Sequence, residues 1–201
     1  MKKHFLLLVL VLAVLVQGCI VKSLHPFYAK SDLVYKSEIL NTWVDQDGNR
    51  WTIKSVKEQP QAYEMIFTKD GKEASFLAHL FQLNGNLFLD FRPLASDGNV
   101  NDLFEMHLLP SHSVAKVVQI SKDVVEIKWF DEDWLHSLFS QNRIKISHEV
   151  IIEENSGNDE DKSYVLTAST SELRKFLMKY GNEEAAFTGD DAMHLVLKRA
   201  I

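Results

Sequence analysis

Alternating apolar and polar residues fill much of the chain after position 50 and predict short antiparallel strands. Tyr63, Met65 and Phe67, for example, alternate with the polar Glu64 and Thr68. A period of two places the three apolar side chains on one face of a strand, where a core must cover them. Comparable runs predict strands over residues 51–56, 62–68, 74–83, 87–91, 104–109, 114–120, 124–129, 149–153, 163–169 and 194–198.

Dipeptides that end in glycine separate several of these runs. Glycine reaches the positive φ that two-residue hairpins require without steric cost, and Asn or Asp tolerates it. These pairs therefore predict that successive strands are joined by tight hairpins into an antiparallel meander. They are Asp47-Gly48, Asp70-Gly71, Asn84-Gly85 and Asp97-Gly98.

The apolar period becomes helical after residue 130. Trp134, Leu135 and Leu138 recur at the spacing of one helix face, and Asp131 precedes them as a candidate cap. The acidic run 131–133 matches the first turn of a helix, where carboxylates stabilise the free N–H groups and the helix dipole. Capping therefore explains these three carboxylates better than general acid and base catalysis does.

A second helix is predicted to begin after Ser169. Ser169 and Glu172 have the spacing of a capping box, and the helical pattern continues to about Tyr180. The side chains expected on its buried face are Leu173, Phe176, Leu177 and Tyr180.

Together these patterns predict a mainly β fold, a β-rich α+β protein. The expected architecture is an antiparallel meander, barrel-like or strongly curved, with two short helices packed on it. An open sheet folded against the helices would give the same alternation, because each strand needs only one buried face. A single β-rich globular domain is expected over residues 37–201. Its tryptophans should be largely buried: Trp43, Trp51, Trp129 and Trp134.

A curved meander could enclose an apolar cavity, as small ligand-carrying barrels do. The aromatic and aliphatic side chains of the central strands would line it. Alternatively, the two helices fill that space, because protein cores are close-packed. The candidate lining residues are Tyr63, Met65, Phe67, Phe76, Leu89 and Phe91.

The first residues have the anatomy of a secretory signal. Lys2 and Lys3 precede an unbroken apolar run over residues 5–16, which is too short to span a bilayer. The following Gln17-Gly18-Cys19, with Val16 before it, resembles a bacterial lipobox. That resemblance implies cleavage between Gly18 and Cys19, a diacylglycerol thioether on the Cys19 sulfur, and further acylation with groups such as palmitate. Residues 1–18 are then the signal peptide, and residues 19–36 a lipidated N-terminus and short tether that packs back on the domain.

Two further resemblances concern the mature chain. The segment "ILNTW" is similar to the opening strand of lipocalin-like barrels, although Asn41 replaces the usual glycine and only Trp43 matches. The segments "SLHPFYAKSDLVY", "LNTWVDQDGNRWTI", "FLAHLFQLNGNLFLDFRP" and "YVLTASTSELRKFLMKYG" resemble an uncharacterised family of bacterial lipoproteins. That family implies lipidation and a β-rich domain, and it brings no catalytic residue.

Ile20 after Cys19 is not the Asp of inner-membrane retention signals, which implies the outer membrane, facing the periplasm, in a Gram-negative host.

The charge balance and the cysteine content limit the classes of partner and of covalent link that the sequence allows. The chain has net charge −6, and residues 1–18 hold two lysines and no acidic residue, so the mature chain carries 20 basic and 28 acidic residues. This balance argues against nucleic acid and against electrostatic docking on anionic lipid. Because charge does not favour docking on the membrane, the acyl groups would have to provide the attachment. Cys19 is the only cysteine, so no internal disulfide can form.

No catalytic or metal motif stands out. The histidines lack ligand spacing, so no metal and no cofactor beyond the acyl groups of Cys19 is expected. Asp90 alternates with Leu89 and Phe91 and is expected to face solvent, and residues 110–113 are expected to form a turn. The sequence therefore favours a non-catalytic binding or protein-interaction module of the cell envelope, with the membrane and an envelope protein as partners. A lipocalin-like carrier of an apolar small molecule and an enzyme without a recognisable motif remain as alternatives.

Overall fold

The computed structural model describes residues 20–94, 108–152, 162–188 and 193–200. Cys19, the signal peptide, the Asp97-Gly98 turn and most of the strand expected at 104–109 lie outside these ranges. Leu108 and Leu109, at the end of that expected strand, are exposed and belong to no strand.

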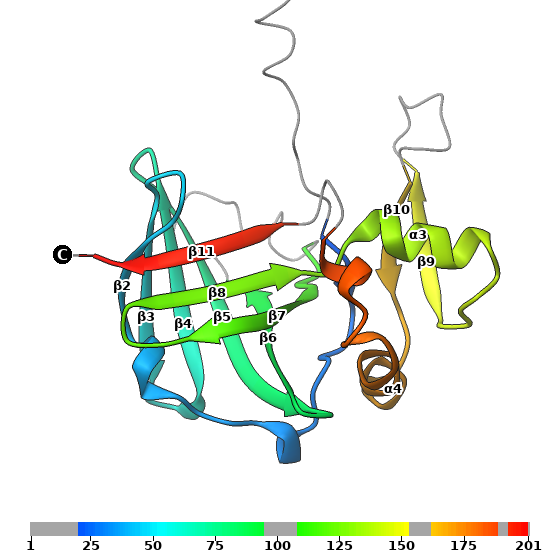
Figure 1. The fold of residues 1–201 in the computed structure, drawn as a ribbon, viewed down its shortest axis with the longest axis horizontal. Coiled ribbons are helices and arrows are strands. Elements are labelled where there is room, and N and C mark those ends of the chain that lie inside the picture. The colour runs from blue at the N-terminus through cyan, green and yellow to red at the C-terminus, as the bar shows by residue number, and fades with distance from the viewer. Residues whose placement is uncertain (1–19, 95–107, 153–161, 189–192, 201) are drawn as a thin grey trace, which may run out of the picture.

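Eight antiparallel strands close into a barrel (Figure 1). Each strand from β2 to β8 pairs antiparallel with the next strand along the chain, and β11 completes the circle by pairing with both β8 and β2. The mainly β prediction is confirmed, and the barrel is closed rather than open. The strands are β2 (Asn41–Val44), β3 (Arg50–Val56), β4 (Gln59–Lys69), β5 (Lys72–Leu83), β6 (Asn86–Pro93), β7 (His112–Ile120), β8 (Val124–Trp129) and β11 (His194–Arg199).

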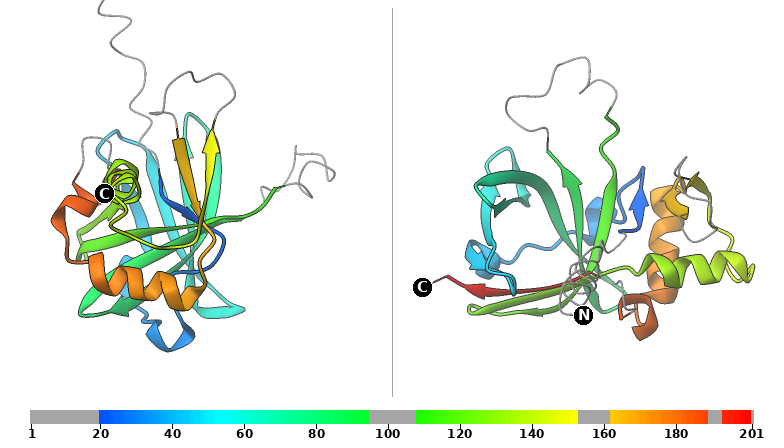
Figure 2. Two further views of the ribbon diagram at one scale, coloured as in Figure 1. Left: turned by 90° about the vertical axis from the view of Figure 1, so that its right-hand side faces the viewer. Right: turned by 90° about the horizontal axis from the view of Figure 1, so that it is seen from above.

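A small side sheet extends from the barrel at the start of β7 (Figure 2). Its first strand, β1, pairs antiparallel with β7 and parallel with β10, and β10 pairs in turn with β9. Chain segments far apart in sequence therefore meet beside the barrel. The strands are β1 (Lys22–Ser23), β9 (His148–Ile152) and β10 (Lys162–Leu166).

The hairpins use the turn residues that the sequence indicates. At Asp70-Gly71 the φ angles are 51° and 75°, and at Asn84-Gly85 they are 49° and 82°. Two consecutive positive φ angles match the twist of the flanking strands, and few residues other than Asn, Asp and Gly adopt them.

Both predicted helices form, and both predicted starts are confirmed. Helix α3 (Glu132–Ser140) begins after Asp131, whose Oδ1 accepts a hydrogen bond from the Trp134 amide at 2.7 Å. Helix α4 (Thr170–Tyr180) begins after Ser169, and the Glu172 carboxylate reaches back to the Ser169 amide at 3.0 Å. Among the helices of the described ranges, none is both long and apolar enough to cross a bilayer.

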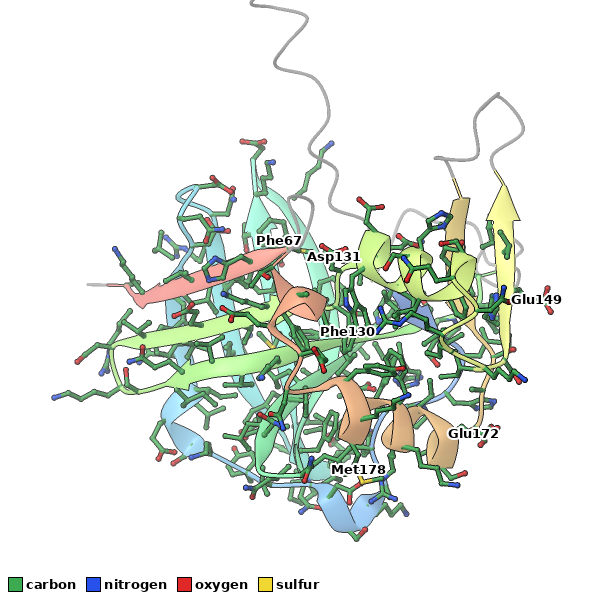
Figure 3. All side chains as sticks on the ribbon, turned by 45° about the vertical axis from the view of Figure 1, so that its right-hand side comes forward. Phe67, Phe130, Asp131, Glu149, Glu172 and Met178 are labelled. Carbon is green, nitrogen blue, oxygen red and sulfur yellow. The ribbon has the colours of Figure 1, made fainter. Side chains whose placement is uncertain are left out.

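The helices pack outside the barrel and do not enter it, so the alternative in which they fill its interior is wrong (Figure 2). They cover outward-facing side chains of β5, β6 and β7 and form a second hydrophobic core there. Phe130 lies at the centre of that core, where its ring contacts Trp134, Phe176 and Phe187 at centroid distances of 5.5, 5.2 and 4.6 Å (Figure 3). Short 3-10 helices complete the fold: η1 (Lys30–Asp32), η2 (Ser37–Ile39) and η4 (Glu184–Phe187).

The barrel interior holds the first core. Trp43, Trp51 and Trp129 are buried in it, as predicted, whereas Trp134 is half-buried in the outer core. The Trp43 indole N–H donates to the Ile39 carbonyl at 2.9 Å, which satisfies its one polar group inside the barrel.

Candidate functional site

The N-terminal segment, residues 20–35, lies across the outer face of the barrel (blue in Figure 1). Ile20 forms a bridge with Asp131, and Val21 is buried. Further along, Leu33 bridges to Phe81 on β5. Ile20, the residue next to Cys19 in the sequence, is therefore already in contact with the folded body.

Side-chain contacts hold this segment in place. The Thr170 hydroxyl donates to the Pro26 carbonyl at 2.9 Å. Arg174 on α4 donates to both Asp32 oxygens, at 2.6 and 2.8 Å, and this bidentate geometry fixes the orientation of the two side chains relative to each other. Phe27 between these two clamps is fully buried.

A groove of about 810 Å³ lies between this segment and the outer face of β4, β5, β6 and β7. Five elements contribute to its wall: the N-terminal segment, the consecutive strands β4, β5 and β6, and β7. The lining residues are Tyr28, Lys30, Leu33, Gln59, Pro60, Gln61, Ala62, Leu77, His79, Arg92 and His112.

A buried carboxylate paired with a histidine lies at the edge of the groove. Asp90 is completely buried, and its Oδ1 lies 2.6 Å from His112 Nδ1. Because a carboxylate only accepts, the Nδ1–H donates, which leaves Nε2 as the second polar atom of the ring. The other carboxylate oxygen accepts from the Phe27 amide at 3.0 Å. The expectation that Asp90 faces solvent is wrong, because the N-terminal segment covers that face.

His79 and Tyr28 stand next to this pair. Strand pairing places His79 directly opposite Asp90, and the ring of Tyr28 lies 4.9 Å from that of His79. Burial lowers the pKa of His79, because the cationic form loses hydration; the Asp90 charge opposes this. Burial, together with the charge of Asp90, raises the pKa of Tyr28 to about 12. Near neutral pH the groove therefore presents a neutral imidazole and a protonated phenol.

Several donors in the groove lack a protein partner. Within the described part of the chain, the side chains of Tyr28, Lys30, His79 and Arg92 have no hydrogen bond or ion pair. Arg92 is half-buried, and a guanidinium in that position normally finds an acceptor. These donors can therefore form hydrogen bonds to acceptor groups of a molecule bound in the groove.

The six residues proposed to line a cavity share the inner face of the barrel. Tyr63, Met65, Leu89 and Phe91 are buried there, and Phe67 and Phe76 are partly buried against the same core. Their side chains pack against other interior residues. Phe91 lies 5.1 Å from Trp129 between ring centroids, and the Tyr63 hydroxyl donates to the Lys36 carbonyl at 3.2 Å.

Sequence reasoning missed the outer groove. Residues 112 and 113 begin β7, so the turn expected at 110–113 is wrong at its second half. Alternation assigned Asp90 correctly to the face opposite Leu89 and Phe91, but it gave no sign that another segment covers that face. The one sequence signal of this covering segment is its own apolar residues within 24–35, because they require a surface to pack on.

No group of three or more His, Cys, Asp or Glu residues in the described ranges is placed to bind a metal ion. Comparisons with protein-family models, with curated proteins and with solved structures found no match for this chain.

Replacing Asp90 with alanine is expected to lower the free energy of unfolding by about 2 to 4 kcal/mol. The change leaves the Phe27 amide and His112 Nδ1 without their acceptor, and each unsatisfied buried group costs about 1 to 3 kcal/mol. Urea denaturation followed by circular dichroism measures the loss. Asp123→Ala, at an exposed turn, is the matched control and should change the stability by about 0.5 kcal/mol or less. Equal stability of the two variants would contradict the role assigned to Asp90.

Two tyrosines are expected to ionise late in an alkaline titration. Burial raises the pKa of both Tyr28 and Tyr63 to about 12, above the ordinary value of 10.0. The unfolded chain loses these protons first, so their contribution to stability is complete below pH 10 and is lost as the pH rises towards 12. Ultraviolet absorbance should show late-ionising tyrosines in the wild type, and one fewer of them in each of Tyr28→Phe and Tyr63→Phe. Ionisation of all five tyrosines near pH 10 would contradict this.

Proposed function

We propose that this protein is a lipoprotein of the bacterial cell envelope that binds a small molecule in its outer groove, without catalysing a reaction. The observation that carries the proposal is the groove itself, where donors that have no protein partner among the described residues line the same hollow as His112, the partner of Asp90. Holding a carboxylate completely buried is costly unless it is paired. In this fold the buried Asp90 carboxylate is paired with His112, and the pairing holds that histidine at the wall of the groove.

Anchoring is proposed from the lipobox, whose Cys19 would carry the acyl groups. Ile20 already pairs with Asp131, so the lipid would hold the folded body close to the bilayer with no flexible spacer between them. In a Gram-negative host the proposed location is the outer membrane, facing the periplasm.

The packed barrel interior favours the outer groove over a lipocalin-like internal site. Trp43, Tyr63, Met65 and Leu89 are at most 1% exposed and belong to one continuous core. A carrier that holds its ligand inside the barrel needs space that these side chains occupy.

Binding rather than catalysis is proposed because of the groups next to His112. Among the described residues that line the groove, none is Ser, Thr or Cys, the nucleophiles that a histidine oriented by a carboxylate activates.

The test is native mass spectrometry of the full-length protein extracted from its own membranes in polymer-bounded lipid discs. A bound small molecule is expected on the wild type. Gln61→Trp, which places a large ring in the groove, should lose that adduct, and Gln82→Trp, an exposed strand position outside the groove, should keep it. An adduct retained by Gln61→Trp, or no adduct on the wild type, would overturn the proposal.

A second candidate function is docking of an envelope protein at the free edge of β9. In the part of the chain that the structure describes, β9 pairs with β10 alone, and it exposes Val150 and Ile151 by 43% and 47%. An open edge offers unpaired backbone groups to a strand of a partner. A cross-link formed in intact cells should disappear in Ile151→Lys and persist in Val118→Lys, which changes an equally exposed residue of β7.

A further inference from the structure

We infer that the groove binds an organic anion, a carboxylate or phosphate ester carried on a small apolar body. This inference rests on the proposed function, because it names the ligand class of the same groove. It is carried by the charges, the unpaired donors and the apolar surface that meet there.

The charges that line the groove are positive. Lys30 and Arg92 contribute two cations, whereas none of the lining residues that the structure describes is Asp or Glu. This contrasts with the whole chain, whose net charge is −6. Asp90, behind the lining, uses one oxygen for His112 and the other for the Phe27 amide, so it is already engaged within the protein.

Arg92 is the principal candidate for contact with the anion. Strand pairing places it beside Leu77, with Glu64 on the far side of that residue, and no ion pair joins Arg92 to any carboxylate in the described ranges. A guanidinium binds carboxylate and phosphate oxygens in a bidentate geometry. The Tyr28 hydroxyl, the His79 ring and Lys30 line the same groove and can supply further hydrogen bonds.

The rest of the groove is suited to an apolar or aromatic body. Leu77 and Ala62 are buried beneath the hollow, Leu33 is half-buried at its edge, and Pro60 adds an apolar ring. The ring of Tyr28 forms a flat aromatic wall on the side of the N-terminal segment. An inorganic ion would leave this surface unused, whereas a small organic anion would cover it.

The experiment uses the full lipoprotein in phosphatidylcholine nanodiscs and four water-soluble probes. Benzoate and phenyl phosphate are the anions, benzamide is the neutral analogue, and benzylammonium is the cation. Isothermal titration, corrected with empty nanodiscs, gives each dissociation constant. The variants are Arg92→Gln, Gln61→Trp and, as a charge-matched control at an exposed position outside the groove, Lys72→Gln.

Both anions should bind more tightly than benzamide, and benzylammonium should bind most weakly. Arg92→Gln should weaken benzoate binding by about tenfold or more, as expected for loss of a charged hydrogen bond, while Lys72→Gln should leave it within about twofold. Nanodiscs that contain phosphatidylglycerol identify the source of the anion. Competition with benzoate indicates a lipid headgroup, and unchanged binding indicates a soluble molecule; both support the anionic class.

Failure of this inference is distinct from failure of the proposed function. If benzamide or benzylammonium binds as well as benzoate, and Gln61→Trp abolishes that binding, the groove is a binding site but not for anions. Absence of benzoate binding, or equal binding by Arg92→Gln and wild type, also overturns the anionic class. The native adduct described above then still decides whether the groove is occupied.

Discussion

Cys19→Ser is expected to move the protein from the membrane fraction to the soluble fraction without changing its fold. Serine cannot form the thioether, and stable attachment requires two or more acyl chains at about 0.8 kcal/mol per buried methylene group. The fold should survive because the described structure starts at Ile20, whose bridge to Asp131 and the burial of Val21 do not involve the Cys19 side chain.

Fractionation in high salt, followed by circular dichroism and intact mass, measures both parts of this result. The wild type should sediment with membranes and carry added acyl mass on a chain that begins at Cys19. Lys22→Ala, an exposed substitution three residues further on, should behave as the wild type. A Cys19→Ser protein that still sediments with membranes and resists high salt would refute lipid anchoring.

Trp43→Ala is expected to lower the free energy of unfolding by about 3 to 5 kcal/mol, the usual cost of truncating a buried aromatic ring. Trp43 is fully buried in the barrel, and its loss also leaves the Ile39 carbonyl without the indole donor. Typical domains are stable by roughly 5 to 15 kcal/mol, so this one change removes a large share.

Trp134→Ala is the comparison within the same chain. Trp134 is half-buried on α3, outside the barrel, and solvent can partly fill the space it leaves. Denaturant unfolding should therefore show a clearly smaller loss than for Trp43→Ala. An equal or reversed order would mean that the barrel interior is not the principal core.

The helix starts and the hairpins could be predicted from sequence because the interactions that form them join residues close together in the chain. Asp131 caps α3 through its own carboxylate, and Ser169 and Glu172 act across only three residues at α4. At Asn84-Gly85 the required φ angles depend on those two residues alone. Such signals are complete within a few neighbouring positions, so no knowledge of the rest of the fold is needed.

The groove could not be derived in the same way. Asp90 and His112 are 22 residues apart, and Phe27 lies 63 residues before Asp90. Alternation says which face of a strand a side chain occupies, but not what covers that face. For Asp90 the covering segment changes a solvent-exposed carboxylate into a buried, paired one.

The sequence by itself determined the strand periods, the hairpin turns, both helices and the mainly β class, because each depends on contacts between near neighbours. Tertiary structure alone decided that β11 closes the barrel between β8 and β2, that the helices pack outside it, and that residues 20–35 form one wall of a polar groove. These features depend on pairings between distant segments, and an alternating pattern leaves such pairings open because it requires only that one face of each strand be buried.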